Sequence, residues 1–474
     1  MIRYISFLLL FTFIGTSCLR SPPPRKRKVA ITYSGGGCRS FAASVGYTRG
    51  LEKIQPQFQD RVNLITAVSG GAWFMAHYGY NPNYQLNDVT AFDPCVAPNA
   101  QAAGQTQASL VGAATKVYLA TGDLQSDTWE QFLSQSVLKD VATIKMQDSL
   151  LSANLVMGAA AFVDYAPVLG TQCNVVASLI RPVIPAPSIY RLEFSSRNGA
   201  MLPSLTIDNQ CTKVTQSCGD GRRLFITDVN VGHAASLSSA DFASTLREGA
   251  AQPAPGGPYK SALLIPTMAI PATSCSQPNN TAQVLDAGDG GFVDVTGIVQ
   301  AIGNGARRVI AFVNSSLPID FSDGQVCPLD TSLMALFGQA TPATWQQCAP
   351  DNLVKQDIQI FSAADYSKLK NQLSTRAAAQ EAAFAYFPKL KVFGNAQIGI
   401  RDGWVELLVV YLNPVASYNS ATTLPDGFPN VPTLGPNFIF KTADEQSQLA
   451  DFTEWLVTND QNLQNQLSSM LGHP

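Results

Sequence analysis

The sequence predicts an α/β fold with a mainly parallel central sheet. Residues 29–33 and 62–68 are short apolar runs of strand length, and each run stops at glycines or at Ser-Gly-Gly. Each is followed by residues with helical spacing, at 41–54 and from 70 to 77. A strand–helix–strand–helix order implies parallel strands joined by right-handed crossovers. The 474 residues are 46% hydrophobic and 14% charged, which suits a large buried core and argues against disorder.

The rest of the chain is expected to form one catalytic domain with an insertion. We place this domain at 29–460, with an inserted cap region at 94–250 and a C-terminal tail at 461–474. Within the cap, the expected elements are helices at 102–138 and 144–162 and strands at 189–194 and 224–229. After the cap, they are strands at 262–270, 308–313, 391–400 and 405–412 and helices at 363–384 and 442–457.

The N-terminus has the pattern of a targeting segment. Arg3 precedes an apolar run at 5–14, and small residues follow the run. The run is shorter than the roughly 20 residues of a membrane-spanning helix. We therefore interpret residues 1–17 as a signal peptide, with an uncleaved anchor as the alternative, and 18–28 as a Pro-rich basic linker. Cys18 would be the first mature residue and a candidate lipoprotein anchor, so we expect a secreted protein or one held at a non-cytosolic membrane face.

Charge and composition narrow the classes of partner. The net charge is −3 and the pI is about 5.7, so the chain lacks the basic footprint of a nucleic-acid-binding protein. Peripheral contact with a membrane is expected, and because the net charge is negative this contact would have to involve a local patch of the surface. The sequence holds three histidines and no Cys-x-x-Cys, so we predict no metal site and no cofactor.

Nine cysteines fit an oxidising compartment. Cys18 lies at the leader boundary and Cys38 lies in a glycine-rich loop, so we set both apart. The remaining seven include two pairs that are close in sequence: Cys211 with Cys218, and Cys327 with Cys348. Because seven is odd, one thiol stays unassigned.

The first motif that carries chemistry is Ala67-Val68-Ser69-Gly70-Gly71, between an apolar run and a helical segment. A nucleophile elbow has this arrangement: the serine occupies a sharp, strained turn, and small neighbours leave room for it. The N-terminus of the following helix favours developing negative charge. Taken alone, a Ser-Gly-Gly sequence is more often a plain turn.

The second motif is Ser34-Gly35-Gly36-Gly37-Cys38-Arg39, also between a strand and a helix. Consecutive glycines let backbone N–H groups converge on an anion without interference from side chains. The nucleotide-binding pattern GxxxxGK[ST] is absent. The loop is therefore a phosphate cradle of another kind, an oxyanion hole, or a tight turn.

The third motif is Asp286-Ala287-Gly288-Asp289-Gly290-Gly291, which could also be ordinary turn chemistry. It gains weight because the three histidines offer little support for a Ser-His-Asp triad. His77 lies just after the elbow and His473 is the penultimate residue, so His233 is the one candidate, with a structural role as its alternative. A serine hydrolase without a catalytic histidine needs another base, and a buried carboxylate with a raised pKa can serve.

Together, SGGGCRS, AVSGGAW and a DGG followed by a strand resemble the patatin and cytosolic phospholipase A2 superfamily. The matching blocks cover roughly residues 28–80 and 284–315. The resemblance implies a three-layer α/β/α fold and a Ser-Asp dyad. Matched position by position, it implies these roles: Ser69 as nucleophile, Asp289 as base, Gly36 and Gly37 as oxyanion-hole N–H donors, and Arg39 as a ligand of the substrate phosphate or oxyanion. Asp286 also begins an Asp-small-Gly triplet, but the spacing to the strand at 308–313 favours Asp289.

The expected activity is therefore hydrolysis of fatty-acyl esters of phospholipids or lysophospholipids through an acyl-enzyme. A fixed arginine suits a phosphate headgroup. The alternative for Arg39 is a surface residue at a helix start. Two other functions stay open: a general carboxylesterase or neutral-lipid hydrolase on the same dyad, and a catalytically silent lipid-binding protein.

Overall fold

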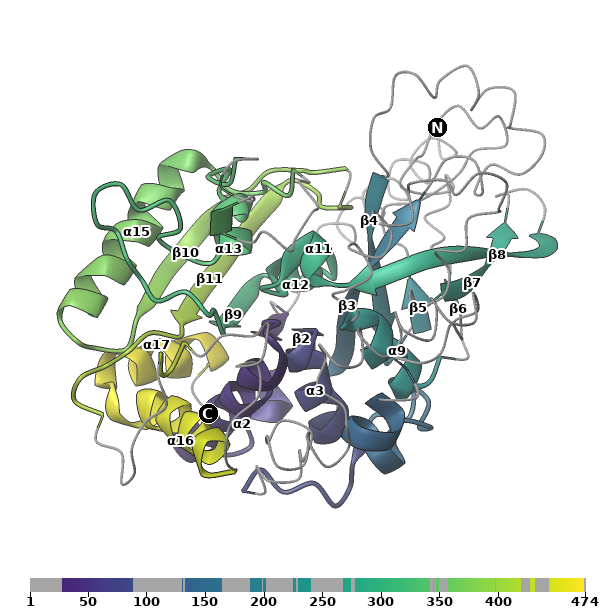
Figure 1. Ribbon diagram of the computed structural model, residues 1–474, viewed down its shortest axis with the longest axis horizontal. Coiled ribbons are helices and arrows are strands. Elements are labelled where there is room, and N and C mark those ends of the chain that lie inside the picture. Colours follow the sequence, from purple (N-terminus) through teal and green to yellow (C-terminus); the bar gives the residue numbers. More distant parts are fainter. Residues whose placement is uncertain are drawn as a thin grey trace, which may run out of the picture.

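The computed structural model describes the following residues: 28–87, 130, 133–163, 188–197, 199–201, 225–226, 229–239, 267–273, 278–341, 344, 347–348, 357–396, 398–418, 427–430 and 443–472. Within these ranges, 11 strands form one sheet, with helices on both of its faces (Figure 1). The predicted signal peptide, the linker as far as residue 27, Cys18 and His473 lie outside the described residues.

Five parallel strands form the centre of the sheet. β1 (Val29–Tyr33) lies between β2 (Leu64–Val68) and β9 (Arg308–Val313). β3 (Asn154–Val163) extends the parallel pairing beyond β2, and β11 (Gly403–Tyr411) extends it beyond β9. β1 and β2 are buried along their whole length, which explains why they are continuous apolar runs. The α/β fold with a parallel centre is confirmed.

Alternation along β1 shows which helices cover which face. The hydroxyl of Tyr33 is 2.7 Å from that of Thr48 on α2 (Gly37–Ile54), and its ring packs edge-on against Phe74 of α3 (Gly70–Tyr80). The neighbouring Thr32 points the other way and donates to the carbonyl of Thr296, just before α12 (Ile298–Gly303). Successive side chains of a strand point to opposite faces, so α2 and α3 cover one face and α12 the other.

Antiparallel strands continue the sheet beyond β3. They are β4 (Ser188–Ser195), β5 (Gly199–Met201) and β6 (Phe225–Ile226). A long hairpin, β7 (Thr267–Thr273) with β8 (Pro278–Asp289), joins the other side of β3. Thus the described strands within 94–250 belong to the central sheet, and helix α9 (Val231–Ser238) packs against β3.

The opposite edge of the sheet is β10 (Phe384–Val392), antiparallel to β11. Helix α15 (Ala363–Ala378) packs beside it. The side-chain amide of Gln372 accepts from the backbone N–H of Tyr386 at 2.9 Å and donates to its carbonyl oxygen at 3.3 Å. One side chain therefore satisfies the two backbone groups that an edge strand leaves open at this position.

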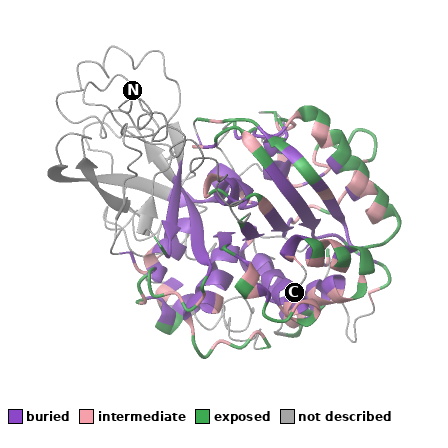
Figure 2. Ribbon diagram, turned by 180° about the vertical axis from the view of Figure 1, so that it is seen from behind, coloured by how far each residue is buried: buried purple, intermediate pink, exposed green. Residues whose placement is uncertain are grey.

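The remaining helical segments are short or lie toward the C-terminus. They are η1 (Phe58–Arg61), η4 (Leu133–Leu138), η5 (Lys139–Val141), α11 (Gly291–Asp294), α13 (Thr331–Leu336), α16 (Ala443–Asn459) and α17 (Gln461–Leu471). α16 packs along α2. Figure 2 shows buried residues concentrated in the central strands, and exposed residues along the outer side of the peripheral helices.

Two predicted elements are wrong. The second half of the helix expected at 144–162 is strand β3, whose alanine-rich part pairs with neighbours on both sides. The strand expected at 391–400 is mostly the connection from β10 to β11, and β10 begins at Phe384, where a helix was expected to end. The tail expected at 461–474 contains α17, which buries Leu463 and Leu467. Among the described residues, no helix combines the length and apolar character of a membrane span.

Candidate active site

Ser69 occupies the turn between β2 and α3, as the sequence predicts. Its backbone angles are φ 52° and ψ −123°, a region that L-residues rarely adopt, so the turn is strained. The following glycine is required for packing: a Cβ atom on Gly70 would lie 2.0 Å from the carbonyl oxygen of Gly37. The Ser69 turn and the glycine-rich loop are therefore in direct backbone contact.

The glycine-rich loop adopts conformations that favour glycine. Gly36 has φ 131° and Gly37 has φ 53°. Gly35 comes close to the serine, since a Cβ atom placed on it would be 3.2 Å from the Cβ of Ser69. Its N–H donates to the carbonyl of Val295 at 2.8 Å. Among the residues that the structure describes, neither the Gly36 nor the Gly37 amide donates a hydrogen bond, so both remain available to an anion.

Arg39 follows this loop in the first turn of α2 and is 4% exposed, so it is not a surface arginine. Its Nε donates to the carbonyl oxygen of Asn314 at 2.9 Å. Burial lowers the pKa of Arg39 to about 10, and the charge of Asp330 opposes this shift. The guanidinium therefore stays protonated at neutral pH.

Asp289 is the last residue of β8 and is 5% exposed. Its Oδ1 accepts from the N–H of Gly291 at 2.7 Å. The pairing along β3 fixes its position: Gly158 pairs with Val68, the residue before Ser69, and the next residue, Ala159, pairs with Asp289. The serine turn and the aspartate therefore meet at the same point along β3.

Asp286, the alternative base, pairs with Phe162. That position lies three strand residues further along β3 than Ala159, a distance of about 10 Å. The backbone register thus brings Asp289, and not Asp286, next to the serine turn.

The C-terminal end of α9 connects the two turns. The carbonyl oxygen of Ser238 accepts from the N–H of Ser69 at 3.1 Å and from the N–H of Gly290 at 3.2 Å. The Ser238 hydroxyl also accepts from the Ser69 N–H at 3.0 Å and donates to the carbonyl of Gly158 at 2.6 Å. Sequence analysis missed Ser238, because a backbone acceptor leaves no side-chain signature.

Asp294, five residues after Asp289, is a second residue that the sequence did not single out. It is fully buried, and its carboxylate accepts from the N–H and hydroxyl of Thr296 and from the N–H of Val299. These bonds fix the conformation of the loop that contains Val295, and the carbonyl oxygen of Val295 accepts the hydrogen bond from the Gly35 N–H. Burial raises the pKa of Asp294 to about 6, although the hydrogen bonds oppose the shift. The one feature of the sequence that could have pointed to Asp294 is that it is an acidic residue shortly after the DGG sequence.

The two described histidines have other partners. The Nε2 of His77 lies 2.9 Å from the carbonyl of Val137, and burial lowers the pKa of this ring. The Nδ1 of His233 lies 2.7 Å from a carboxylate oxygen of Glu130. These contacts give both histidines structural roles.

The disulfides correct one feature of the sequence analysis. Cys327 and Cys348 are bonded as predicted, with an S–S distance of 2.09 Å. Cys38, which was set apart, is also disulfide-bonded. Counting Cys38 gives eight cysteines after Cys18, so the number of cysteines no longer requires an unpaired thiol. The predicted Cys211–Cys218 pair lies outside the described residues.

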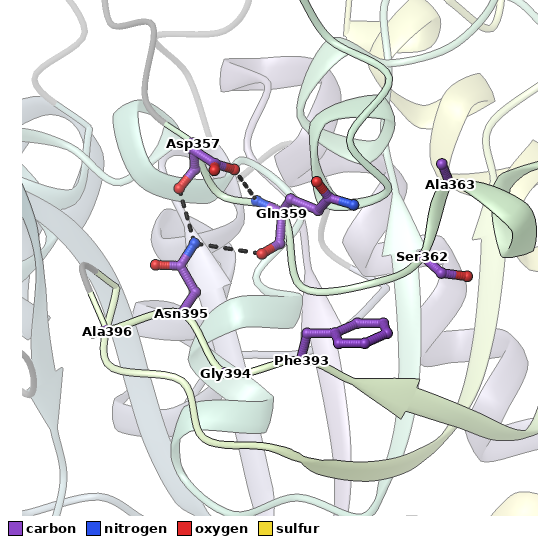
Figure 3. Close-up of a pocket in the computed structure, with 8 residues that line it drawn as sticks. All are labelled: Asp357, Gln359, Ser362, Ala363, Phe393, Gly394, Asn395 and Ala396. Atoms are coloured by element: carbon purple, nitrogen blue, oxygen red, sulfur yellow. Dashed lines mark hydrogen bonds between the residues drawn. The ribbon is translucent and has the colours of Figure 1, made fainter.

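A surface pocket of about 570 Å³ lies elsewhere, between the start of α15 and the end of β10. Figure 3 shows that its lining residues, which include Asp357, Phe393 and Asn395, come from neither the serine turn nor the glycine loop. Within the described residues, no group of three or more His, Cys, Asp or Glu side chains could hold a metal ion.

Comparisons with known proteins give structural similarity only. No protein-family model and no curated protein matches the chain. Among solved structures, human GIVD cytosolic phospholipase A2 is similar at 13% identity and a TM-score of 0.46, over 94% of this chain and 60% of that one. The same enzyme in complex with methyl gamma-linolenyl fluorophosphonate and terbium chloride gives 16% identity and a TM-score of 0.42, over 94% and 59%. The chain thus spans about 60% of the length of these structures, and a similarity of this size assigns it no reaction.

Proposed function

We propose that this protein is a lipid acyl hydrolase with Ser69 as nucleophile and Asp289 as base. The observation that carries the proposal is the register along β3, which brings the strained Ser69 turn and the buried end of β8 to one point. A serine in such a turn presents its hydroxyl, and an adjacent carboxylate can take the proton.

The reaction follows from these positions. Asp289 accepts the hydroxyl proton of Ser69 as its oxygen attacks the ester carbonyl. The Gly36 and Gly37 amides stabilise the tetrahedral oxyanion. Collapse expels the alcohol, which recovers the proton, and leaves an acyl-enzyme. Water, deprotonated by Asp289, then releases the fatty acid and restores the serine.

Phospholipids and lysophospholipids are the proposed substrates, because a protonated arginine lies at the glycine loop. A buried, protonated guanidinium is a fixed planar cation whose geometry suits a phosphate. Binding at a membrane surface and secretion through the leader remain predictions from the sequence.

The test measures fatty-acid release from phosphatidylcholine vesicles by the wild type and by Ser69→Ala, Asp289→Asn and Asp286→Asn. We expect loss in the first two variants and retention in the third. If Asp286→Asn lost activity and Asp289→Asn kept it, Asp286 and not Asp289 would be the base. Release from a neutral ester but not from phospholipid would support the carboxylesterase alternative, and no release from either would support the silent lipid-binding protein.

A further inference from the structure

Ser238 lies between the two halves of the proposed dyad. Ser69 follows β2 and Gly290 follows β8, and these strands are more than two hundred residues apart in sequence. Nevertheless, their N–H groups donate to one carbonyl oxygen, that of Ser238, at 3.1 and 3.2 Å. A carbonyl oxygen has two lone pairs, so this acceptor is fully used.

The hydroxyl of Ser238 adds a third connection, to the strand that sets the register. It accepts from the Ser69 N–H at 3.0 Å and donates to the carbonyl of Gly158 at 2.6 Å. Gly158 pairs with Val68, directly before the nucleophile. Ser238 is completely buried, so water does not compete for these bonds.

We propose that Ser238 is a positioning residue that holds the nucleophile turn and the base turn at a fixed separation. This inference rests on the proposed function, because it assigns a role within the Ser69–Asp289 pair. A residue that only ended α9 would need no contact with either turn. Ser238 instead contacts both, and through Gly158 it also contacts the strand that aligns them.

This arrangement also removes one amide from those that could bind the oxyanion. The Ser69 N–H is committed to the carbonyl and hydroxyl of Ser238. That commitment is consistent with the assignment of the oxyanion to the Gly36 and Gly37 amides.

The test compares Ser238→Ala with Ser236→Ala. Ser236 is a buried serine on the same helix whose hydroxyl donates to the carbonyl of His233 at 2.8 Å. It therefore controls for the loss of a buried hydroxyl. Ser238→Ala keeps the carbonyl that joins the two turns but removes the hydroxyl that links the Ser69 N–H to Gly158. We expect this loss to lower kcat and the rate of labelling by a fluorophosphonate by about 10-fold, with KM unchanged, since small misplacements of reacting groups have effects of this size. Ser236→Ala should keep the wild-type kcat, with a similar shift in melting temperature.

A double-mutant cycle separates positioning from general damage. If Ser238 acts by aligning Ser69 with Asp289, Ser238→Ala should have little further effect in an Asp289→Asn background. Full additivity, or equal losses in Ser238→Ala and Ser236→Ala, would overturn the inference and leave the proposed function intact. A wild type that neither releases fatty acid nor reacts with the fluorophosphonate would instead refute the proposed function itself.

Discussion

The guanidinium of Arg39 lies directly against the backbone of Gly36: a Cβ atom placed on Gly36 would be 2.7 Å from Nη2. The cation is therefore beside the amides that we assign to the oxyanion. An anionic group bound at this loop would meet backbone dipoles and a full positive charge together. Headgroup selectivity should consequently depend on this one side chain.

Replacement of Arg39 should separate phospholipid from neutral substrates. We expect Arg39→Ala to lower kcat/KM for phosphatidylcholine by about 10- to 100-fold, the effect of losing hydrogen bonds to a charged group. Hydrolysis of an uncharged ester, measured on the same preparation, should fall much less. Arg39→Lys, which keeps the charge but not the planar fork, should be intermediate. Equal losses on both substrates would argue that Arg39 only supports the loop.

Gly70→Ala should separate the nucleophile turn from the glycine loop. The new methyl group would meet the carbonyl oxygen of Gly37 at 2.0 Å, and backbone cannot move aside easily. We expect fluorophosphonate labelling to slow by about 100-fold. Gly79→Ala is the matched control, since it lies on the same helix but meets only the end of the Leu155 side chain. Wild-type labelling of Gly70→Ala would contradict the described contact.

Asp294 should give the protein a specific dependence of stability on pH. Its pKa is about 6 in the folded protein, against 3.8 as the ordinary value. The folded state therefore binds the proton more tightly, and the resulting stabilisation is present below pH 3.8 and is lost as the pH rises through 6. We expect the wild type, compared with Asp294→Asn, to be about 2 kcal/mol more stable to unfolding at pH 4 than at pH 7. Urea denaturation at the two pH values measures this difference, and a difference that grew toward pH 7 would reverse the assignment.

Removal of the Cys327–Cys348 disulfide should affect stability more than catalysis. The bond closes a loop with a sequence separation of 21, for which about 3 kcal/mol of stabilisation is typical. We expect the Cys327→Ser/Cys348→Ser double variant to unfold at lower urea concentration and to keep its kcat at 25 °C. A large loss of kcat in the folded variant would show that the loop after β9 reaches the site.

The sequence predicted the parts of the site that depend on local backbone chemistry. Runs of glycine beside a serine or an aspartate are constrained by sterics within a few residues, and the Ser69 turn and the loop at Gly36 have the expected conformations. The buried parallel strands β1, β2 and β9 were equally clear, because both faces of the sheet are covered and most of their residues are apolar.

Features that depend on distant partners were not predictable. The run Gly158–Ala161 is rich in alanine and reads as helix, yet it forms the strand that aligns both turns. The Asp289-Gly290 sequence is typical of a loop, but Asp289 itself ends a long strand. Ser238 acts through a carbonyl oxygen, which every residue possesses, and through a single serine hydroxyl, so nothing in its sequence neighbourhood distinguishes it.

The hydrogen bonds between Gln372 and the backbone of the edge strand β10 have a consequence for the behaviour of the protein at high concentration. Exposed sheet edges invite strands from other molecules, and this is a common start of aggregation. At Tyr386 this pairing is blocked, because the side chain of Gln372 already hydrogen-bonds the backbone N–H and the carbonyl oxygen that an incoming strand would need. A side chain too short to reach, as in Gln372→Ala, should leave the fold intact but make the protein self-associate more readily.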